Sequence, residues 1–510
     1  MQVPHRPIGL ESPDLTSARR ARDLEHLEAG HVVDVLVIGG GITGCGVALD
    51  AASRGLDVAL VEAHDLAFGT SRWSSKLVHG GLRYLAHGDI AVAWESAVER
   101  GYLMSRIAPH LIRPLPHVMP WGADLRERSL VRMGLAAADV LRMVARTPRG
   151  TLGRSRTLDA ATALQLIPAL NPSGVAGATA HWDGQLVDDA RLVVAVARTA
   201  ARYGARIVTR TPALDVSGAG ARVRDDHGRS IDIHARNVIV ATGVWTSALD
   251  PQTHLTASRG SHVLLTPESL GHPRAALTVP VPGERSRYVF ALPTREGFVI
   301  AGITDDEVSG ALPDVPTAPD SDVTWILEHL SRALARPLTM ADVIGTYAGL
   351  RPLVSTPGAP SADISRRHLV ERRPEGHVVV TGGKLTTYRR MAEDAVNALG
   401  LGVPSVTASL PLVGAQSRRT PVPAGMPRRL VERYGAEAPR VLAHAAGDRA
   451  LTEPVASGVP TLGVEVVHAV RCEGARDVED VVERRTRIAL VPAHLERAGP
   501  RVAEIVESCR

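Results

Sequence analysis

Residues 32–62 read VVDVLVIGGGITGCGVALDAASRGLDVALVE, and the order of residue types in this stretch decides the fold. The β-branched run at 32–38 has the composition of a buried parallel strand. Glycines follow it, residues 42–53 have a helical pattern, and Gly55 is placed to end that helix. Residues 57–61 form a second apolar run. The stretch therefore predicts a strand, a helix and a second strand, the repeating unit of an α/β protein with a parallel sheet.

The glycines between the first strand and the helix have the spacing of a phosphate-binding turn, because residues 39–44 are G-x-G-x-x-G. Gly39 permits the tight turn, Gly41 lets the backbone approach a pyrophosphate, and Gly44 lets the helix pack closely on the strand. Glu62 follows about 20 residues later at the end of the second strand, where its carboxylate can accept hydrogen bonds from a ribose. The unit predicts a site for NAD or FAD. The residues expected to contact the cofactor here are Gly39, Gly41, Ile42, Thr43, Gly44 and Glu62.

Two later strand-to-turn segments favour FAD over NAD. Residues 238–243, VIVATG, resemble the ATG segment of flavoproteins with two dinucleotide-binding folds, which packs near the cofactor. Residues 378–387, VVVTGGKLTT, end in a turn whose backbone amides could hold the ribityl or pyrimidine end of a flavin. Each turn taken alone is equally consistent with an ordinary βα turn of a parallel sheet. The residues expected to contact the cofactor here are Thr242, Gly243, Gly383, Lys384, Leu385 and Thr386.

Apolar runs and helical periodicity outline the remaining elements. Strands are predicted at 205–209, 221–224, 232–241, 298–302 and 377–381, and helices at 90–105, 129–145, 189–203 and 322–334. Residues 1–30 form a polar tail, in which a short charged helix over 17–30 is capped by Ser17 and stopped by Gly30. Residues 402–427 are rich in Pro, Ser and Thr, as a linker is, and 428–510 have the pattern of a small helical domain.

The composition is that of a globular protein with two or three domains. The chain has 510 residues, of which 45% are hydrophobic and 22% charged, so disorder is not expected. A net charge of +4 is too small to indicate a nucleic-acid partner. We expect a cytoplasmic protein, because no apolar run approaches the roughly 20 residues of a membrane span and no secretory signal is present. Cys45, Cys472 and Cys509 are widely separated and have no ligand spacing with the histidines, so no metal site is predicted.

Residues 70–85, TSRWSSKLVHGGLRYL, combine hydroxyls, cations and glycines, which suits an anionic ligand, although a solvated polar loop would also have this composition. The stretch resembles the TS-x-x-SSKL-x-HGGLRYL signature of the FAD-dependent, respiratory and quinone-linked glycerol-3-phosphate dehydrogenases. Further segments resemble that family in its own order. They are LVDDARL at 186–192, RGSH at 259–262, YAGLRPL at 347–353 and GGKLTTYR at 382–389.

The resemblance implies a particular architecture within the α/β class. It consists of a two-dinucleotide-binding, Rossmann-like FAD domain, an α+β substrate or cap domain and a helical C-terminal domain. The FAD domain would be built from residues 31–105, 165–250 and 345–401. The substrate domain would comprise 106–164 and 251–344, followed by the linker at 402–427 and the C-terminal domain at 428–510.

The resemblance also implies a role for individual residues. The FAD contacts in the signature stretch would be Thr70, Ser71, Ser75, Lys76, His79, Gly80, Gly81 and Leu82. The substrate contacts would be Arg83, Tyr84, His262, Arg351, Arg366 and Lys384. The arginines and the lysine would form a cationic pocket for a phosphate monoester. Arg366 is the least firmly aligned of them, because Arg367 lies beside it.

The expected reaction is oxidation of sn-glycerol-3-phosphate to dihydroxyacetone phosphate, with transfer of the C2 hydride to FAD. A base must take the C2 hydroxyl proton, and histidine suits this task near neutral pH, whereas arginine stays protonated. We therefore expect His262 to be the base, with Arg83, Arg351 and Lys384 as orienting and charge-stabilising catalytic groups. Without its motif, His262 would be interpreted as a structural histidine. A cation could instead acidify the hydroxyl enough for water to accept the proton.

The family resemblance implies that electrons pass to a membrane quinone from a protein bound peripherally to the inner face of the cell membrane. Residues 124–156 contain eight arginines among apolar positions, which is typical of a basic amphipathic helix on a membrane surface, or equally of a solvated arginine-rich face. A homodimer is a further candidate assembly. The alternatives are a glycerol-3-phosphate oxidase that uses oxygen, an amine or amino-acid oxidase, and a cofactor-binding regulatory module without turnover.

Overall fold

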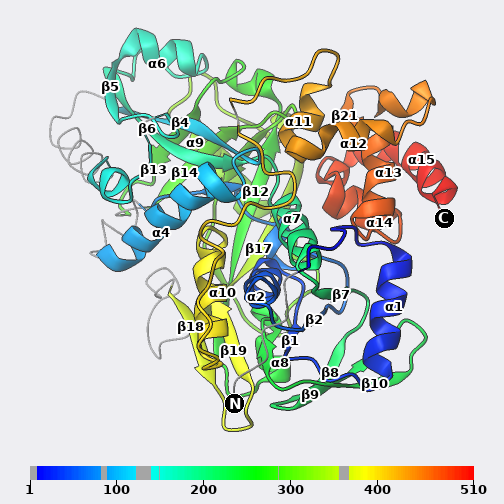
Figure 1. Ribbon diagram of the computed structural model, residues 1–510. Helices are drawn as coiled ribbons and strands as arrows, with labels where there is room; N and C mark the ends of the chain where they lie inside the picture. Colours follow the sequence, from blue (N-terminus) through cyan, green and yellow to red (C-terminus); the bar gives the residue numbers. More distant parts are fainter. Residues whose placement is uncertain are drawn as a thin grey trace.

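The structure is a computed structural model that describes residues 9–81, 89–121, 139–148, 150–284, 287–354, 367–417 and 419–509. A parallel sheet lies at the centre beneath α2, α7 and α10, a larger mixed sheet lies beside it, and the C-terminal helices form a separate group (Figure 1). Within the described residues, no helix combines the length and the apolar character that crossing a bilayer requires.

The central sheet places the predicted glycine turn at the reversal of its strand order. Its strands are β1 (Val35–Ile38), β2 (Val58–Val61), β7 (Arg206–Val208), β11 (Val238–Val240), β18 (His368–Arg372) and β19 (Val378–Gly382). The order is β18-β19-β11-β1-β2-β7, and all neighbours except β18 and β19 are parallel. From β1, the chain continues to β2 on one side of β1, whereas β11 pairs with the opposite side of β1. In such sheets, ligands bind beyond the carboxyl ends of the strands at this point.

Both faces of the central sheet are covered. Helices α2 (Ile42–Ser53), α7 (Asp189–Arg202) and α10 (Tyr388–Asn397) pack on one face, and α2 contacts the other two. Gly46 allows this approach, because a Cβ atom there would lie 2.8 Å from the ring of Tyr388. The second face is covered by α1 (Ser17–Glu28) and a small sheet of β8 (Ala213–Ser217), β9 (Gly220–Arg224) and β10 (Ser230–His234).

Two local predictions were wrong in detail. The single strand expected at 232–241 is two strands, since β10 pairs antiparallel with β9 whereas β11 joins the central sheet beside β1. The N-terminal helix is present, but Thr16 caps it rather than Ser17, and the Thr16 hydroxyl accepts the Arg19 N–H at 3.0 Å. Helix α1 is also packed on the protein, because Arg19 is buried and donates to the backbone of Ala201.

The second sheet carries two of the predicted substrate residues, His262 on β12 and Arg351 on β17. Its strands are β3 (Leu77–Val78), β4 (Ile112–Trp121), β5 (Arg156–Asp159), β6 (Gly177–Leu186), β12 (Leu255–Leu265), β13 (Ala276–Pro280), β14 (Tyr288–Pro293), β15 (Val299–Gly302), β16 (Asp306–Val308) and β17 (Val343–Val354). Helices α6 (Ala160–Leu166) and α9 (Asp320–Ser331) contribute to the core cluster on one face. The long strand β17 pairs antiparallel with β12 and also contacts β19 of the central sheet.

The predicted helical C-terminal region is present. It consists of α11 (Arg428–Tyr434), α12 (Ala438–Ala443), the hairpin β20 (Pro454–Ala456) and β21 (Val459–Leu462), α13 (Gly463–Cys472), α14 (Val478–Asp480) and α15 (Pro492–Ser508). The preceding Pro-rich segment has no helix or strand among its described residues, yet Leu410 and Leu412 are buried in the core of the central sheet. The predicted helix at 90–105 is α4 (Ile90–Tyr102) and a following turn of π-helix. Of the helix predicted at 129–145, only residues 139–145 lie within the described part, and 139–144 are helical.

Candidate active site

The glycine turn after β1 fits only residues without side chains. Gly39 has a φ of +113°, and a Cβ atom there would lie 2.6 Å from the carbonyl oxygen of Ala241. A Cβ atom on Gly44 would clash with the carbonyl oxygen of Gly39. Gly41 caps α2 without any side-chain hydrogen bond to the first turn of the helix. The turn therefore brings bare backbone to the N-terminus of a buried helix, which is the arrangement that binds a pyrophosphate.

Glu62 holds the glycine turn in place from the end of β2. Its two carboxylate oxygens accept the backbone N–H groups of Gly40 at 2.5 Å and His64 at 2.8 Å. Burial raises the pKa of Glu62, and the two backbone donors act in the opposite direction. Each oxygen still has a lone pair after accepting one amide, so ribose hydroxyls can also donate to this carboxylate. The contact with a ribose stays a prediction.

The loop at 70–76 connects the glycine turn to the second sheet. The Ser71 hydroxyl accepts the N–H of Ile42 at 2.9 Å, and the Thr70 hydroxyl donates to the Leu350 carbonyl oxygen at 2.5 Å. Gly349 of β17 lies so close to this loop that a Cβ atom there would be 2.7 Å from Trp73. The loop therefore lies between the start of α2 and β17. Its residues can contact a ligand bound at the start of α2 or one bound beside β17.

Lys76 is buried and its ammonium is 2.6 Å from Asp189 Oδ1. Asp189 belongs to the LVDDARL segment at the start of α7, and its other oxygen accepts from the backbone and the hydroxyl of Ser74. Although burial opposes ionisation, Lys76 and Arg487 bring the pKa of Asp189 down to about 2. The Lys76 ammonium therefore positions the loop. If Lys76 contacts the cofactor, we expect its backbone atoms to make the contact.

His262 is completely buried on β12 and is held on two sides. Its Nε2 atom lies 2.9 Å from the Ser75 hydroxyl, and its ring stacks on Tyr347, with centroids 4.5 Å apart and planes inclined by 12°. Tyr347 is the register partner of His262 on β17, and its hydroxyl donates to the Ser74 carbonyl oxygen. The pKa of His262 is held well below 6.5, mainly by burial and to a smaller extent by the charges of Arg351 and Lys76. The imidazole is therefore neutral at pH 7 and able to accept a proton.

Arg351 lies four residues after Tyr347 on the same strand. Its guanidinium donates to Asp305 Oδ1 at 3.0 Å, to the Ser258 hydroxyl at 3.2 Å and to the Thr304 carbonyl oxygen at 3.1 Å. The group lies over Gly260 of the RGSH segment, where any Cβ atom would clash with it. The β12–β17 pair thus brings Arg351 and His262 to one region, and Gly260 provides the space for the guanidinium.

The turn after β19 lies beside the end of β17. Gly382 and Gly383 have φ values of +76° and +69°, and a Cβ atom on Gly382 would be 3.0 Å from Val354. Lys384 donates from Nζ to the Ser96 hydroxyl of α4 at 2.7 Å. The Thr381 hydroxyl donates to the Gly243 carbonyl oxygen at 3.5 Å. This last contact joins the two predicted flavin turns, those after β11 and β19, at the carboxyl ends of these strands in the central sheet.

The structure places His79, Gly80 and Gly81 after β3, next to a buried ion pair. The Gly80 N–H donates to Asp183 Oδ1 at 3.1 Å, and Arg100 donates to the same oxygen at 2.5 Å. A side chain at Gly80 would clash with the Arg100 guanidinium. Four predicted site residues, Leu82, Arg83, Tyr84 and Arg366, lie outside the described residues.

Sequence reasoning missed several residues that support this site. Asp305, the carboxylate partner of Arg351, has no motif of its own, and the π-stacking of Tyr347 on His262 follows only from the strand register. The C-terminal region also reaches the 65–76 loop. Arg484 and Arg485 pair with the buried Asp65 at 2.7 and 2.8 Å. No sequence signal could pair residues that are about 420 positions apart.

Comparisons with known proteins agree with this arrangement. A family model described as FAD dependent oxidoreductase matches residues 34–423, and a model described as the C-terminal domain of alpha-glycerophosphate oxidase matches residues 405–509. "Glycerol-3-phosphate dehydrogenase 1" of Mycobacterium tuberculosis is 49% identical over 98% of this chain and 98% of its own. The mitochondrial glycerol-3-phosphate dehydrogenase SDP6 of Arabidopsis thaliana is 34% identical over 94% of this chain and 83% of its own.

Among solved structures, the glycerol-3-phosphate dehydrogenase of Bacillus halodurans complexed with FAD superimposes with a TM-score of 0.75 at 25% identity, covering 97% of this chain and 94% of that one. L-alpha-glycerophosphate oxidase of Mycoplasma pneumoniae shares the fold, with a TM-score of 0.58 at 19% identity over 75% of this chain and 99% of its own. The glycine turn, the flavin turns and the His262–Arg351 strand pair therefore lie in a chain that belongs to the FAD-dependent glycerol-3-phosphate dehydrogenase family.

Proposed function

We propose that this protein oxidises sn-glycerol-3-phosphate to dihydroxyacetone phosphate with FAD and passes the electrons to a membrane quinone. The observation that carries the proposal is the neutral, buried His262, which Ser75 and Tyr347 hold beside Arg351. The loop that supplies Ser75 is bonded to the start of α2 through Ser71. A proton acceptor, a phosphate-binding cation and the cofactor turn are thereby linked within one short loop and one strand pair. The relatives named above act on the same substrate by name.

The described residues fit an FAD. Gly39 and Gly44 allow the tight turn that leaves the backbone at Gly41 bare at the start of α2, and the turns at Gly243 and Gly383 follow strands β11 and β19 of the same sheet. When bound, FAD supplies the acceptor of the hydride that leaves C2. The amide N–H groups of these turns can donate to the cofactor, and the positive end of the α2 dipole favours its phosphates.

The chain's own residues would handle the proton and the phosphate. His262 takes the proton of the C2 hydroxyl as C2 becomes a ketone carbon, and the Ser75 hydroxyl fixes the orientation of the imidazole. The cationic side chains of Arg351 and Lys384 would neutralise the phosphate and stabilise negative charge on the C2 oxygen. Arg83, Tyr84 and Arg366 are predicted to complete the pocket. The homodimer stays a prediction.

The test of the proposed acceptor is turnover with glycerol-3-phosphate and either a soluble quinone analogue or oxygen. A dehydrogenase reduces the quinone much faster than it produces hydrogen peroxide. The oxidase alternative deserves this direct comparison because the matched C-terminal model takes its description from alpha-glycerophosphate oxidase. Stoichiometric peroxide, with no acceleration by quinone, would replace the quinone in this proposal by oxygen.

Peripheral membrane binding is supported by exposed apolar residues on two helices. Ile90 and Trp94 are exposed on α4, and Val140 and Val144 are exposed on the helix at 139–144. The segment after the second helix contacts the last turn of α4, since a Cβ atom at Gly101 would lie 2.8 Å from the Thr147 hydroxyl. Apolar side chains on adjacent helices can enter the headgroup region of a bilayer.

The membrane contact is tested by sedimentation with anionic lipid vesicles. The variants Val140→Glu and Val144→Glu place a carboxylate on the exposed apolar surface and are expected to reduce the sedimented fraction. Val315→Glu changes an equally exposed valine elsewhere and serves as the matched control. Equal sedimentation of all three variants and the unmodified enzyme would remove these helices from the membrane-binding surface.

A further inference from the structure

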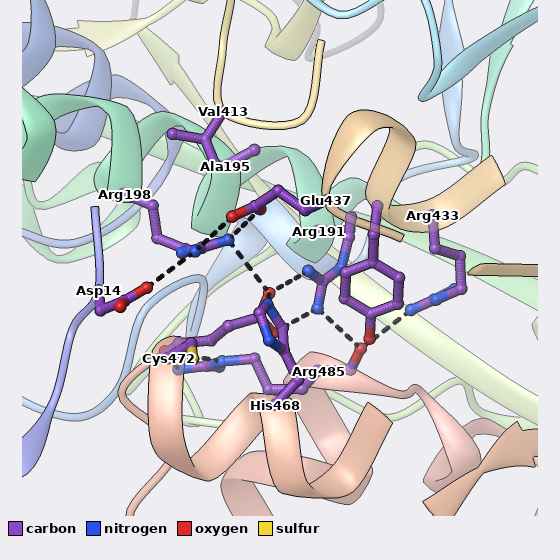
Figure 2. A network of polar contacts seen from close by, with 12 residues as sticks. Asp14, Arg191, Ala195, Arg198, Val413, Arg433, Glu437, His468, Cys472 and Arg485 are labelled. Carbon is purple, nitrogen blue, oxygen red and sulfur yellow. Dashed lines mark hydrogen bonds and ion pairs between the residues drawn. The ribbon is translucent and has the colours of Figure 1, made fainter. Parts of the chain in front are cut away.

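Three metal-ligating side chains meet in the C-terminal region, away from the site described above. His444 follows the last turn of α12, while His468 and Cys472 lie one turn apart on α13. Figure 2 shows His468 and Cys472 next to each other within a network of charged residues. Their ligand atoms and that of His444 all lie within 4.8 Å of one another, and this is the one such group of three among the described residues. The two histidines are 24 positions apart in the chain, which conceals the cluster in the sequence.

The distances within the cluster are close to those around a tetrahedral zinc ion. With Zn–N bonds of about 2.0–2.1 Å and a Zn–S bond of about 2.3 Å, two nitrogen ligands lie about 3.3 Å apart, and nitrogen and sulfur lie about 3.5 Å apart. In the structure, His444 Nε2 is 3.0 Å from His468 Nδ1 and 3.8 Å from Cys472 Sγ. The third pair, His468 Nδ1 and Cys472 Sγ, lies within 4.8 Å, so a contraction of the cluster would bring all three atoms to bonding distance from one ion.

The surroundings of His468 direct the lone pair of its Nδ1 atom towards the cluster. His468 is fully buried, and its Nε2 atom lies 3.5 Å from the carboxylate of the buried Glu473. The carboxylate is paired with Arg191, and a carboxylate at this position favours the tautomer with the proton on Nε2. Metal-binding histidines commonly have such a carboxylate at the second ring nitrogen, where it fixes the tautomer and orients the ring.

Cys472 is a buried thiol next to a cationic donor. Arg440 donates to Sγ at 3.6 Å and is itself held by Asp14, which is 2.6 Å from the guanidinium. Binding of a metal ion would release the thiol proton, and the Arg440 donor would then stabilise the resulting thiolate.

We propose that His444, His468 and Cys472 bind one Zn²⁺ ion, with water as the fourth ligand. Imidazole and thiolate ligands suit Zn²⁺, and the partial exposure of His444 leaves one side open to water. The ion would fasten α12 to α13. The residues that flank both helices already form ion pairs with α7 of the central domain, because Arg198 binds Glu437, which precedes α12, and Arg191 binds Glu473, which follows α13. The site would thus fix the position of the C-terminal region on the flavin domain.

The competing interpretation of the cluster is a metal-free hydrogen bond between the two imidazoles. Cobalt(II) distinguishes the two, because tetrahedral cobalt absorbs in the red, where oxidised flavin does not. The FAD-loaded enzyme is treated with a chelator, desalted and titrated with Co²⁺. The proposal predicts red absorption that saturates at one ion per chain and is abolished by Zn²⁺. It also predicts a higher midpoint of thermal unfolding with Zn²⁺ than without it.

Three variants locate the ion. Cys472→Ser and His444→Gln each remove one ligand and should weaken Co²⁺ binding by at least about 100-fold, more than the loss of an outer-shell partner. Cys509→Ser removes a cysteine at the chain end and should bind Co²⁺ like the unmodified enzyme. Retained flavin absorbance shows that each variant is folded. If the unmodified enzyme takes up no cobalt, or if Cys472→Ser and His444→Gln bind it as tightly as Cys509→Ser, the proposed site does not exist.

Discussion

Replacing His262 with glutamine removes the proposed proton acceptor while keeping a side chain of similar reach. In the unmodified protein, the imidazole receives a hydrogen bond from Ser75 or donates one to it at 2.9 Å, and it stacks on Tyr347. Glutamine can hydrogen-bond to the same serine, but its amide does not accept a proton at neutral pH. The substitution therefore tests proton transfer more directly than truncation to alanine, which would open a cavity next to Tyr347.

The expected size of the effect follows from the state of the imidazole. Burial, Arg351 and Lys76 keep the pKa of His262 well below 6.5, so nearly every molecule carries a neutral base at pH 7. The rate lost in the variant then measures the contribution of the base itself. General-base catalysis contributes about 10²–10⁴-fold, which corresponds to about 3–5 kcal/mol in the activation free energy. We expect flavin reduction in His262→Gln to slow by a factor in that range.

The assay is anaerobic stopped-flow reduction of the enzyme-bound flavin by glycerol-3-phosphate, which isolates the chemical step from reoxidation. His110→Gln is the matched control, because His110 is another buried histidine whose pKa is lowered, to about 3, and it lies outside the candidate site. The control should be reduced at the rate of the unmodified enzyme. If His262→Gln is also reduced at that rate with its flavin fully bound, His262 is not the base, and water or another group accepts the proton.

Three further predictions follow from the structure. His262 must be neutral to accept a proton, and its lowered pKa keeps it neutral above pH 6.5. The rate of flavin reduction should therefore show no loss caused by this group as the pH falls from 8 to 6.5. A decline in rate centred within that interval would contradict the assignment. Gly44→Ala should yield flavin-free protein because the new Cβ would clash with the turn, whereas Gly499→Ala, which has open space around it, should retain full flavin absorbance. Glu473→Gln removes the carboxylate partner of the buried Arg191 and should lower the free energy of unfolding by about 3–5 kcal/mol, measured by urea denaturation; no change in the midpoint would show that the pair adds nothing.

The parallel sheet could be predicted from the sequence because its signals are local. The β-branched run, the glycines and the helix of residues 32–62 are adjacent, and each belongs to one element of the observed βαβ unit. The second sheet gave weaker signals. Strand β12 contains Arg259, Gly260 and Ser261 at its centre, so it lacks the alternation of a half-buried strand. Its length and its pairing with β17 depend on tertiary contacts that periodicity does not encode.

The candidate site divides in the same way. The family resemblance predicts His262, Arg351 and Lys384 as site residues, but only the strand register shows that Tyr347 stacks on the histidine. The pairing of Lys76 with Asp189 joins two motifs that the sequence presents separately, and it assigns the lysine ammonium to positioning the loop. Buried ion pairs over such separations depend on the fold as a whole, so no local pattern predicts them.

The most direct test of the proposed activity is to mix the purified, yellow enzyme with glycerol-3-phosphate in the absence of oxygen and to record the visible flavin band. The proposed function predicts that the band bleaches fully within the dead time of manual mixing, that glycerol without the phosphate leaves it unchanged, and that one dihydroxyacetone phosphate forms per flavin. A flavin band that persists with excess glycerol-3-phosphate would contradict the proposed substrate, even though the protein belongs to this family of flavoproteins.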